Sequence, residues 1–351
     1  MSSRTTILFL GATGYIGGSL LDRIIKHPSY SDWDVTLYVR SAEKAKKLDE
    51  LNLGYKIVTG TPSDLEAAAA VNKIVINCAS SDDLPTTEAI LKGAKSFYET
   101  TGKPATLIHT SGSGCVVDNA LGQFASEDVY DDLDTERLND LPATQWHRHV
   151  DIPIIEAATA GYVKSYLVAP GFIYGLATGK FVEAGLVNPV STVLLGVAMG
   201  ALAAGQGVLV GSQKNIWHCA EIHEVIDVYL IIFINVLEGK EIPNGREGYY
   251  FVENGPIVTL EICKKAVEAL FDMKKIKSAE FREYTKEELF AAADTPLVYL
   301  GSNSRIRSSK IRQLGWKPSR TPDAYLLGIR EEIKVMYTTD LSKGFPSHRV
   351  D

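Results

Sequence analysis

The sequence predicts an α/β fold in which helices cover both faces of a parallel sheet. Three observations support this prediction. The chain has 351 residues, enough for one large core or two joined lobes. Its first half alternates short apolar runs with longer helical patterns, as parallel sheets do. The first of these apolar runs leads directly into a glycine-rich turn and then a helical pattern.

The individual elements follow from this alternation. The strands expected in the first half are 6–10, 35–39, 55–58, 73–77, 106–109 and 165–169. The helices expected between them are 16–26, 44–51, 64–70, 87–101 and 152–160. The second half is less regular. We expect helices there at 221–237, 260–271 and 323–337, a short helix within 308–320, and a strand at 249–253.

Composition and charge exclude several kinds of partner. Hydrophobic residues make up 45% of the chain and charged residues 23%, which is ordinary for a globular protein. The formal charge of −7, without a long basic run, argues against a nucleic-acid surface. The apolar stretches 190–205 and 228–237 are shorter than the ~20 residues of a membrane span, so we expect buried helices there. The expected partner is a small-molecule substrate, with no nucleic acid and no membrane, and a homodimer is left open.

The cysteines indicate a reducing compartment. Cys78, Cys115, Cys219 and Cys263 lie far apart in the sequence, so neither a CxxC motif nor a zinc knuckle is formed. Such sparse cysteines fit a cytoplasmic location, and the short apolar run before the glycine turn does not have the pattern of a signal peptide.

The glycine turn "GATGYIGG" predicts a dinucleotide site. Gly11, Gly14 and Gly17 form a GxxGxxG pattern between an expected strand and an expected helix. Gly11 permits a tight turn, Gly14 lets the backbone approach a pyrophosphate, and Gly17 allows close packing of helix on strand. The helix N-terminus would face the anion. The alternative is a purely structural turn.

The end of the second expected strand indicates NADP rather than NAD. NAD-binding sites place an acidic residue there, which holds the ribose 2′-hydroxyl. This sequence has Arg40 instead, followed by Ser41 and Lys44. A guanidinium suits a 2′-phosphate, although Arg40 could also be an ordinary solvated charge at a helix start.

At this point the chain resembles the extended short-chain dehydrogenase/reductase family, particularly atypical members related to NAD-dependent epimerases and dehydratases. The resembling segments are "GATGYIGG", "KIVINCASSDD" (73–83), "TLIHTSGSG" (106–114) and "VAPGFIYG" (168–175). The resemblance spans nearly the whole chain. It implies a Rossmann fold with a doubly wound parallel sheet and a smaller C-terminal substrate lobe. The NADP-binding domain would comprise 1–175 and 217–255, and the lobe 176–216 and 256–351.

The resemblance also implies which residues meet the cofactor and the substrate. Ser111 would be the active-site serine that ends the fifth strand. Asp82 and Asp83, in the loop after the fourth strand, could face the nicotinamide or merely cap a helix. Beyond Arg40, Ser41 and Lys44, the expected cofactor contacts are Gly11, Thr13, Gly14, Tyr15, Ile16, Gly17, Asn77, Cys78, Ala79, Ser80, Pro170, Phe172 and Ile173.

The sequence departs from the family pattern at the proton donor. The family uses a tyrosine with a lysine four residues later, and no tyrosine in this chain has that lysine. The matching positions hold His147 and Asp151, which share one face of a helix. We expect His147 to donate the proton and Asp151 to orient it, unless Asp151 accepts bonds from ribose hydroxyls. His149 would point away from His147 in a regular helix and remains a second candidate.

Two other interpretations of the side chains in this segment stay open. His147, His149 and Asp151 could instead bind a metal, although no further cluster of ligands is evident and we expect none. His147 could also be a polar residue at a helix start in a protein that turns nothing over.

Three functions are therefore considered. The first is an NADP-dependent oxidoreductase acting on a small, apolar carbonyl or alcohol. The second is an isomerase, epimerase or lyase in which His147 moves protons. The third is a non-catalytic NADP-binding sensor or regulator. The residues that would line an apolar substrate site, unless they belong to the core, are Leu186, Val187, Leu194, Leu195 and Trp217.

Overall fold

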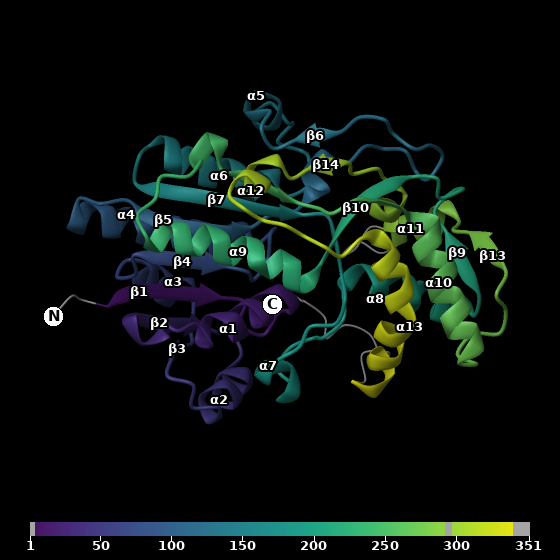
Figure 1. The fold of residues 1–351 in the computed structure, drawn as a ribbon, viewed down its shortest axis with the longest axis horizontal. Helices are drawn as coiled ribbons and strands as arrows, with labels where there is room; N and C mark the ends of the chain where they lie inside the picture. Colours follow the sequence, from purple (N-terminus) through teal and green to yellow (C-terminus); the bar gives the residue numbers. More distant parts are fainter. Residues whose placement is uncertain (1–3, 292–296, 340–351) are drawn as a thin grey trace.

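A parallel sheet of seven strands forms the centre of the protein (Figure 1). The computed structural model describes residues 4–291 and 297–339. Every neighbouring pair in this sheet is parallel. In spatial order its strands are β11 (Tyr249–Val252), β7 (Val163–Pro170), β5 (Ala105–Thr110), β4 (Ile74–Asn77), β1 (Thr5–Leu10), β2 (Trp33–Tyr38) and β3 (Lys56–Val58).

Both faces of the sheet are buried. In β1, Ile7 and Phe9 belong to one hydrophobic core, and Leu8 and Leu10 belong to another on the opposite face. Successive side chains of a strand point to opposite faces, so a strand buried on both sides reads as a continuous apolar run. This is why "TTILFL" shows no alternation of polar and apolar residues.

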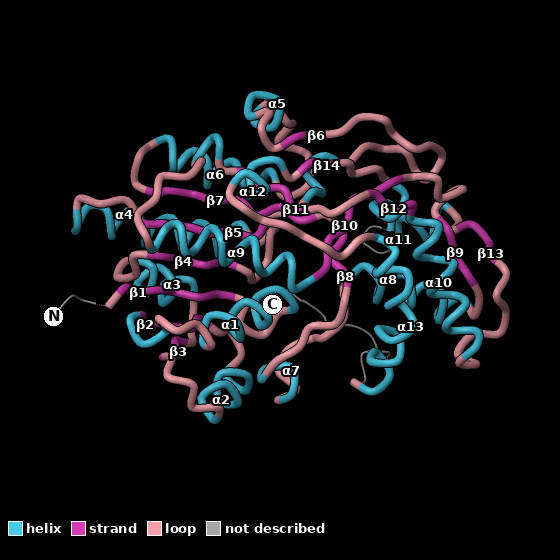
Figure 2. Tube along the Cα trace, viewed as in Figure 1, coloured by secondary structure: helices cyan, strands magenta, loops and turns pink. Residues whose placement is uncertain are grey.

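Helices form a layer on each face (Figures 1 and 2). The cores above and below the sheet show which helix belongs to which layer. One layer contains α1 (Tyr15–Ile25), α2 (Ala42–Glu50) and α9 (Ile222–Leu237). The other contains α3 (Pro62–Ala69), α4 (Leu84–Thr101) and α6 (Arg148–Thr159). The predicted α/β class with a doubly wound, Rossmann-like sheet is thus confirmed.

The strand order reverses between β1 and β4. From β1 the chain passes to β2 and β3 on one side, and then returns to β4 and β5 on the other. Ligands of open α/β sheets bind at such a switch point, outside the carboxyl ends of the strands. The fold therefore directs attention to the residues that follow β1, β2 and β4.

A second group of elements lies beside the sheet, on the right of Figure 1. Three helices and a small mixed sheet share a third hydrophobic core. The helices are α8 (Thr192–Ala204), α10 (Thr259–Asp272) and α13 (Pro322–Thr338). The small sheet comprises β8 (Phe172–Tyr174), β10 (Ile216–Glu221) and β12 (Pro256–Val258). A separate parallel pair is formed by β9 (Gly207–Leu209) and β13 (Phe281–Glu283).

Short elements complete the described chain. The helices are α5 (Thr135–Asn139), α7 (Lys180–Glu183), α11 (Lys286–Ala291) and α12 (Ser309–Gln313). The strands β6 (Tyr130–Asp131) and β14 (Ile306–Arg307) form a parallel pair. The 3₁₀ turns are Tyr30–Asp32, Ser113–Val116, Gly245–Glu247 and Leu297–Gly301.

Every strand and helix expected from the sequence is present, with ends that differ by a few residues. The apolar stretches 190–205 and 228–237 lie in α8 and α9, as expected, and no helix in the described ranges has the length and apolar character of a membrane span. The strands that sequence patterns missed are short, two to six residues. The division into two domains stays a prediction. Of the ranges assigned to those domains, residues 1–3, 292–296 and 340–351 lie outside the described residues.

The contact between α3 and α4 tests how tightly one helical layer is packed. A Cβ atom added at Gly93 of α4 would collide with the carbonyl of Glu66 and lie 2.5 Å from Cβ of Ala69. We expect Gly93→Ala to lower the free energy of unfolding by about 1–3 kcal/mol, the usual range for overpacking. Urea denaturation would measure this, with Lys92→Ala on the exposed side of α4 as control. A stabilised Gly93→Ala protein, as helix propensity alone would give, would contradict the packing argument.

Candidate cofactor and active site

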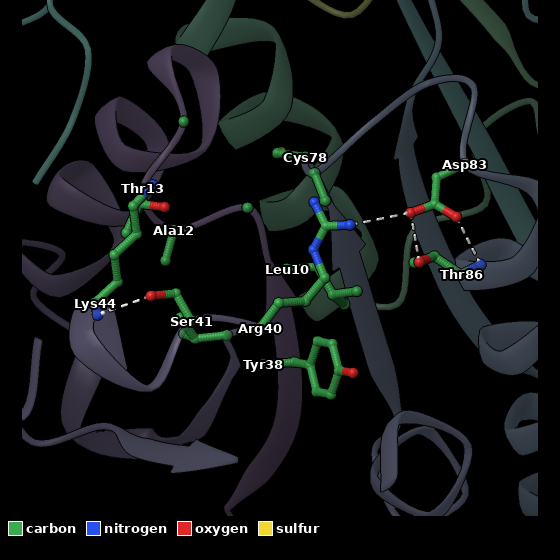
Figure 3. A pocket seen from close by; sticks show the side chains of 14 residues that line it. Leu10, Ala12, Thr13, Tyr38, Arg40, Ser41, Lys44, Cys78, Asp83 and Thr86 are labelled. Carbon is green, nitrogen blue, oxygen red and sulfur yellow. Dashed lines mark hydrogen bonds and ion pairs between the residues drawn. The ribbon is translucent and has the colours of Figure 1, made fainter. Parts of the chain in front are cut away.

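A cavity of about 220 Å³ opens at the switch point of the sheet (Figure 3). It is built from the loops that follow β1, β2 and β4 and from the first turn of α4. Its lining residues are Leu10, Gly11, Ala12, Thr13, Gly14, Tyr38, Val39, Arg40, Ser41, Lys44, Cys78, Ala79, Asp83 and Thr86. The cavity thus contains eight of the predicted cofactor residues: Gly11, Thr13, Gly14, Arg40, Ser41, Lys44, Cys78 and Ala79.

Close backbone contacts explain the glycines of the first loop. Gly11 has φ +85°, a conformation that residues with a side chain rarely adopt, and a Cβ there would collide with the carbonyl of Cys78. A Cβ at Gly17 would collide with the carbonyl of Gly11. Gly14 is less crowded, since its nearest neighbour would be the Gly11 carbonyl oxygen at 3.3 Å, and it faces the cavity at the start of α1.

Basic and hydroxyl groups line the far side of the cavity. Ser41 caps α2 by accepting a hydrogen bond from the backbone N–H of Lys44, at 3.3 Å. The Arg40 guanidinium reaches across the cavity toward Asp83, with 3.7 Å between Nη1 and Oδ2 (Figure 3). Asp83 also caps α4, where it accepts bonds from the N–H and hydroxyl of Thr86.

The other predicted cofactor residues lie outside this cavity: Tyr15, Ile16, Gly17, Asn77, Ser80, Pro170, Phe172 and Ile173. Several have other contacts. The Tyr15 hydroxyl donates to the Gly175 carbonyl, Ser80 accepts from the N–H of Asp82, and Phe172 stacks on Trp217 with 4.0 Å between ring centroids.

His147 has an unusual backbone at the start of α6. Its φ of 66° and ψ of −22° lie in the left-handed region, which costs about 1–3 kcal/mol for a residue with a side chain. Its carbonyl accepts bonds from the N–H groups of Val150 and Asp151, both at 2.9 Å, so it begins the helix. Its ring does not cap the helix. Instead, Nδ1 lies 2.9 Å from Oδ1 of Asp82, in the loop between β4 and α4.

The other edge of the His147 ring lies against two glycines. A Cβ atom at either Gly112 or Gly114 would lie only 2.8 Å from Nε2 of His147. Gly112 has an extended backbone, with φ −166° and ψ 156°, which any residue can adopt. The position of the His147 ring, and not the backbone conformation of Gly112, is therefore the reason for a glycine here. Within the described part of the chain, no hydrogen bond to Nε2 is formed.

Ser111 and Asp151 do not have the predicted arrangement. Both are buried, and the Ser111 hydroxyl donates to Oδ2 of Asp151 at 2.9 Å. The same oxygen accepts a bond from the Tyr249 hydroxyl at 2.8 Å, and Tyr249 in turn accepts one from Arg148. Among the described residues, Asp151 therefore makes no hydrogen bond to the ring of His147. The expected orienting contact is absent because i,i+4 spacing assumes a regular helix, and the backbone of His147 is left-handed. The catalytic roles of Ser111 and Asp151 stay predictions.

Burial dominates the electrostatics of Asp151. It raises the pKa of that carboxyl to about 6, although His147, the hydrogen bonds from Tyr249 and Ser111, and the charge of Arg148 act in the opposite direction. The carboxyl is thus a structural centre that ties α6 to β5 and β11.

His149 does not point away from His147 as predicted. Its Nε2 lies 3.2 Å from the carbonyl oxygen of Asp82, so both histidines meet the same residue. His149 is exposed, and Asp151 is turned into the core. The three side chains proposed as alternative metal ligands therefore do not converge, and no group of three or more metal-binding side chains occurs in the described ranges.

A buried histidine also lies near the site, and sequence reasoning missed it. His109 is fully buried, and its Nδ1 lies 3.1 Å from the side-chain nitrogen of Asn77. Burial, followed by the nearby charge of His147, lowers the pKa of His109 to about 3. Asn77 also accepts a hydrogen bond from the N–H of Ala79, so it helps to fix the conformation of the loop after β4.

Sequence reasoning also left the roles of Asp82 and Asp83 undecided. The signal was present, because "SSDD" follows the fourth strand and the carboxyl ends of parallel strands share one edge of the sheet. The partner, His147, comes 65 residues later, and only the folded chain brings the two together.

The structure has a Rossmann fold built like that of the extended short-chain dehydrogenase/reductases, with a cavity at the switch point where such folds bind dinucleotides. No family model matches the chain. Oxidase ucsJ from an Acremonium species is 27% identical over 337 residues, which cover 90% of this chain and 93% of that protein.

Solved structures show the same fold at low identity. PbgP3 protein from Burkholderia pseudomallei has a TM-score of 0.65 at 15% identity, covering 97% of this chain and 98% of that chain. UDP-glucuronic acid 4-epimerase from Bacillus cereus, in complex with UDP-glucuronic acid and NAD, has a TM-score of 0.60 at 14% identity, covering 95% and 100%. dTDP-glucose 4,6-dehydratase from Bacillus anthracis, in complex with NAD, has a TM-score of 0.59 at 13% identity, covering 95% and 98%. The resemblance seen in the sequence is thus confirmed at the level of the fold.

The contrast between Gly14 and its neighbours gives a test of the cavity. We expect Gly14→Val to abolish dinucleotide binding with little loss of stability, because the new side chain would enter the cavity and the backbone conformation is ordinary. Gly17→Val should instead destabilise the protein, because its side chain would strike the Gly11 carbonyl. Calorimetric titration and thermal melting would separate the two. Undiminished binding by Gly14→Val would place the phosphates elsewhere.

Proposed function

We propose that the protein is an NADP-dependent oxidoreductase of the extended short-chain dehydrogenase/reductase type that acts on a small carbonyl or alcohol. The observation that carries this proposal is the Asp82–His147 pair. It lies on the loop that borders the cofactor cavity, at the helix start where the family's tyrosine is missing. The relative named an oxidase supports a redox reaction.

The residues present fit a dinucleotide. The first loop leaves an open cavity at the N-terminus of α1, and Gly14 keeps that cavity free of a side chain. The pyrophosphate would lie against residues 11–14, and the adenosine end beside Arg40, Ser41 and Lys44. When bound, the nicotinamide would supply or accept the hydride. Everything else in the reaction falls to the protein's own side chains.

His147 is proposed to move the proton. Its Nδ1 is occupied by Asp82, so Nε2 is the atom left to exchange a proton with a substrate oxygen. In reduction the imidazolium would donate from Nε2 to the carbonyl oxygen, and in oxidation the neutral ring would take the alcohol proton. Imidazole suits both directions near neutral pH.

NADP is the proposed cofactor because of the groups that follow β2. No carboxylate occupies the end of that strand, where one would hold a ribose 2′-hydroxyl. Arg40 and Lys44 line the cavity instead, and Asp83 holds the guanidinium of Arg40 within it. At least three of the solved neighbours are in complex with NAD, so the shared fold alone does not decide between the cofactors.

An isomerase or epimerase is the second candidate, because several of the solved neighbours are epimerases. The same His147 would then move a proton while the cofactor is regenerated within each cycle. Cofactor stoichiometry separates the two functions, since an oxidoreductase consumes one NADPH or NADP⁺ for each turnover.

Cofactor preference can be tested at Arg40. We expect tighter binding of NADP than of NAD, and Arg40→Ala should weaken NADP binding about ten- to a hundredfold, since a charge-assisted contact contributes about 1.5–3 kcal/mol. NAD binding should change little. Fluorescence titration of both cofactors would measure this. Lys46→Ala, which removes an exposed charge of the same helix outside the cavity, is the control. Equal affinities in the unmodified protein would argue for NAD.

The proton role can be tested at His147. We expect His147→Ala to lower turnover by about 10²–10⁴-fold, the usual range for a lost general acid or base, with cofactor affinity nearly unchanged. NADPH oxidation with a panel of aliphatic and aromatic aldehydes and ketones would measure this. His27→Ala, which removes a histidine after the C-terminal end of α1 and outside the cavity, is the control. Full activity in His147→Ala would exclude the mechanism. Tight NADPH binding with no turnover of any carbonyl would favour the sensor.

A further inference from the structure

The carboxylate of Asp82 forms a hydrogen bond with the ring of His147. Its Oδ1 lies 2.9 Å from Nδ1 of His147, and its other oxygen accepts a bond from the Ser81 hydroxyl at 3.0 Å. The backbone of Asp82 is fixed as well, because its N–H donates to Ser80 and its carbonyl meets His149. Asp82 is therefore held from four directions.

The ionic state of Asp82 determines which ring nitrogen of His147 carries a proton. Burial acts to raise the pKa of the Asp82 carboxyl, but the hydrogen bond and charge of His147, the Ser81 hydroxyl and the charge of His149 hold that pKa below its usual value. An ionised carboxylate can only accept a hydrogen bond. The proton must therefore lie on Nδ1, and in the neutral ring Nε2 carries a lone pair.

The direction of that lone pair is also fixed. Nε2 lies beside Gly112 and Gly114, where either Cβ would come within 2.8 Å of it. The left-handed backbone of His147 aims the ring there, and Asp82 prevents the ring from turning over, because a turn would exchange Nδ1 and Cδ2.

From this geometry we propose that Asp82 is the positioning residue of the site, which holds His147 in the Nδ1–H form with Nε2 directed at the niche of Gly112 and Gly114. This inference rests on the proposed role of His147 as the group that moves the proton. The neighbouring Asp83 has a separate task, because it caps α4 and meets Arg40.

The location of Asp82 links the two halves of the site. Ala79 and Asp83 line the cofactor cavity, and Asp82 lies between them on the same loop. The loop that closes the cofactor cavity thus also fixes the proton-transferring ring. A purely structural tie between two surface loops would need neither a particular tautomer nor a free Nε2.

The first test reads the tautomer directly and needs no substrate. Long-range ¹H–¹⁵N correlation spectra of the full chain, at a pH where the ring is neutral, distinguish the Nδ1–H from the Nε2–H form, with His147→Ala used for assignment. We expect Nδ1–H in the unmodified protein. Asp82→Ala should shift the ring toward Nε2–H, which free histidine favours. Asp82→Asn should keep Nδ1–H, because an amide oxygen still accepts the bond.

The second test asks whether Asp82 acts through His147. We expect Asp82→Ala to lower kcat about 10- to 100-fold, less than the loss of His147 itself, while KM for NADPH stays nearly unchanged. In the His147→Ala background, Asp82→Ala should cause no further loss, because residues that act as a unit are not additive. Asp34→Asn, which removes an aspartate paired with Lys56 at 2.7 Å on β2, is the control for a lost surface ion pair.

These tests separate the inference from the proposed function. An Nε2–H ring in the unmodified protein, or an unchanged tautomer in Asp82→Ala, would overturn the inference whatever the activity. A further loss of kcat on adding Asp82→Ala to His147→Ala would overturn it as well. The expected tautomers in a protein that reduces no carbonyl would support the role of Asp82 and refute the proposed function alone.

Discussion

Close backbone packing at the switch point of the sheet governs the geometry around it. Gly17 of α1 rests on the carbonyl of Gly11, and Gly11 rests on the backbone that follows β4 at Cys78 and Ala79. Only residues without a Cβ permit these approaches, so β1, α1 and the loop after β4 are joined as one unit. The direction in which that loop leaves the sheet is thereby fixed. That direction in turn determines where Asp82 and Asp83 lie, a few residues later in the same loop.

The histidine is fixed from behind by a buried polar network. Asp151 accepts bonds from Ser111 of the loop after β5 and from Tyr249 of β11, and Arg148 joins the network through Tyr249. A buried carboxyl costs free energy unless it is hydrogen-bonded, and removing one partner leaves the others unsatisfied. The network therefore holds the first turn of α6 in a single position. His147, at the start of that turn, is placed by side chains that are themselves buried.

The sequence predicted the scaffold well and the site only in part. Strands buried on both faces read as unbroken apolar runs, and the glycine loop has a fixed relation to the strand before it and the helix after it. The positions of Gly11, Gly14 and Arg40 could therefore be inferred. The pairing of His147 could not, because it depends on a left-handed residue that breaks the helical spacing and on Asp82, which lies on another loop. The bond from Ser111 to Asp151 could not be inferred either, since the end of a strand can direct a side chain into the core as easily as out of it.

The narrow niche of Gly112 and Gly114 has a consequence for the history of such proteins. Nε2 of His147 occupies the space that a side chain at either position would need. A side chain at position 112 or 114 and the histidine in its present position therefore exclude one another. During evolution, any side chain at these two positions must therefore be replaced by glycine before the ring of His147 can occupy its present position. Two glycines in this turn, the histidine and an aspartate after the fourth strand are accordingly expected to be gained and lost together among descendants of a common ancestor.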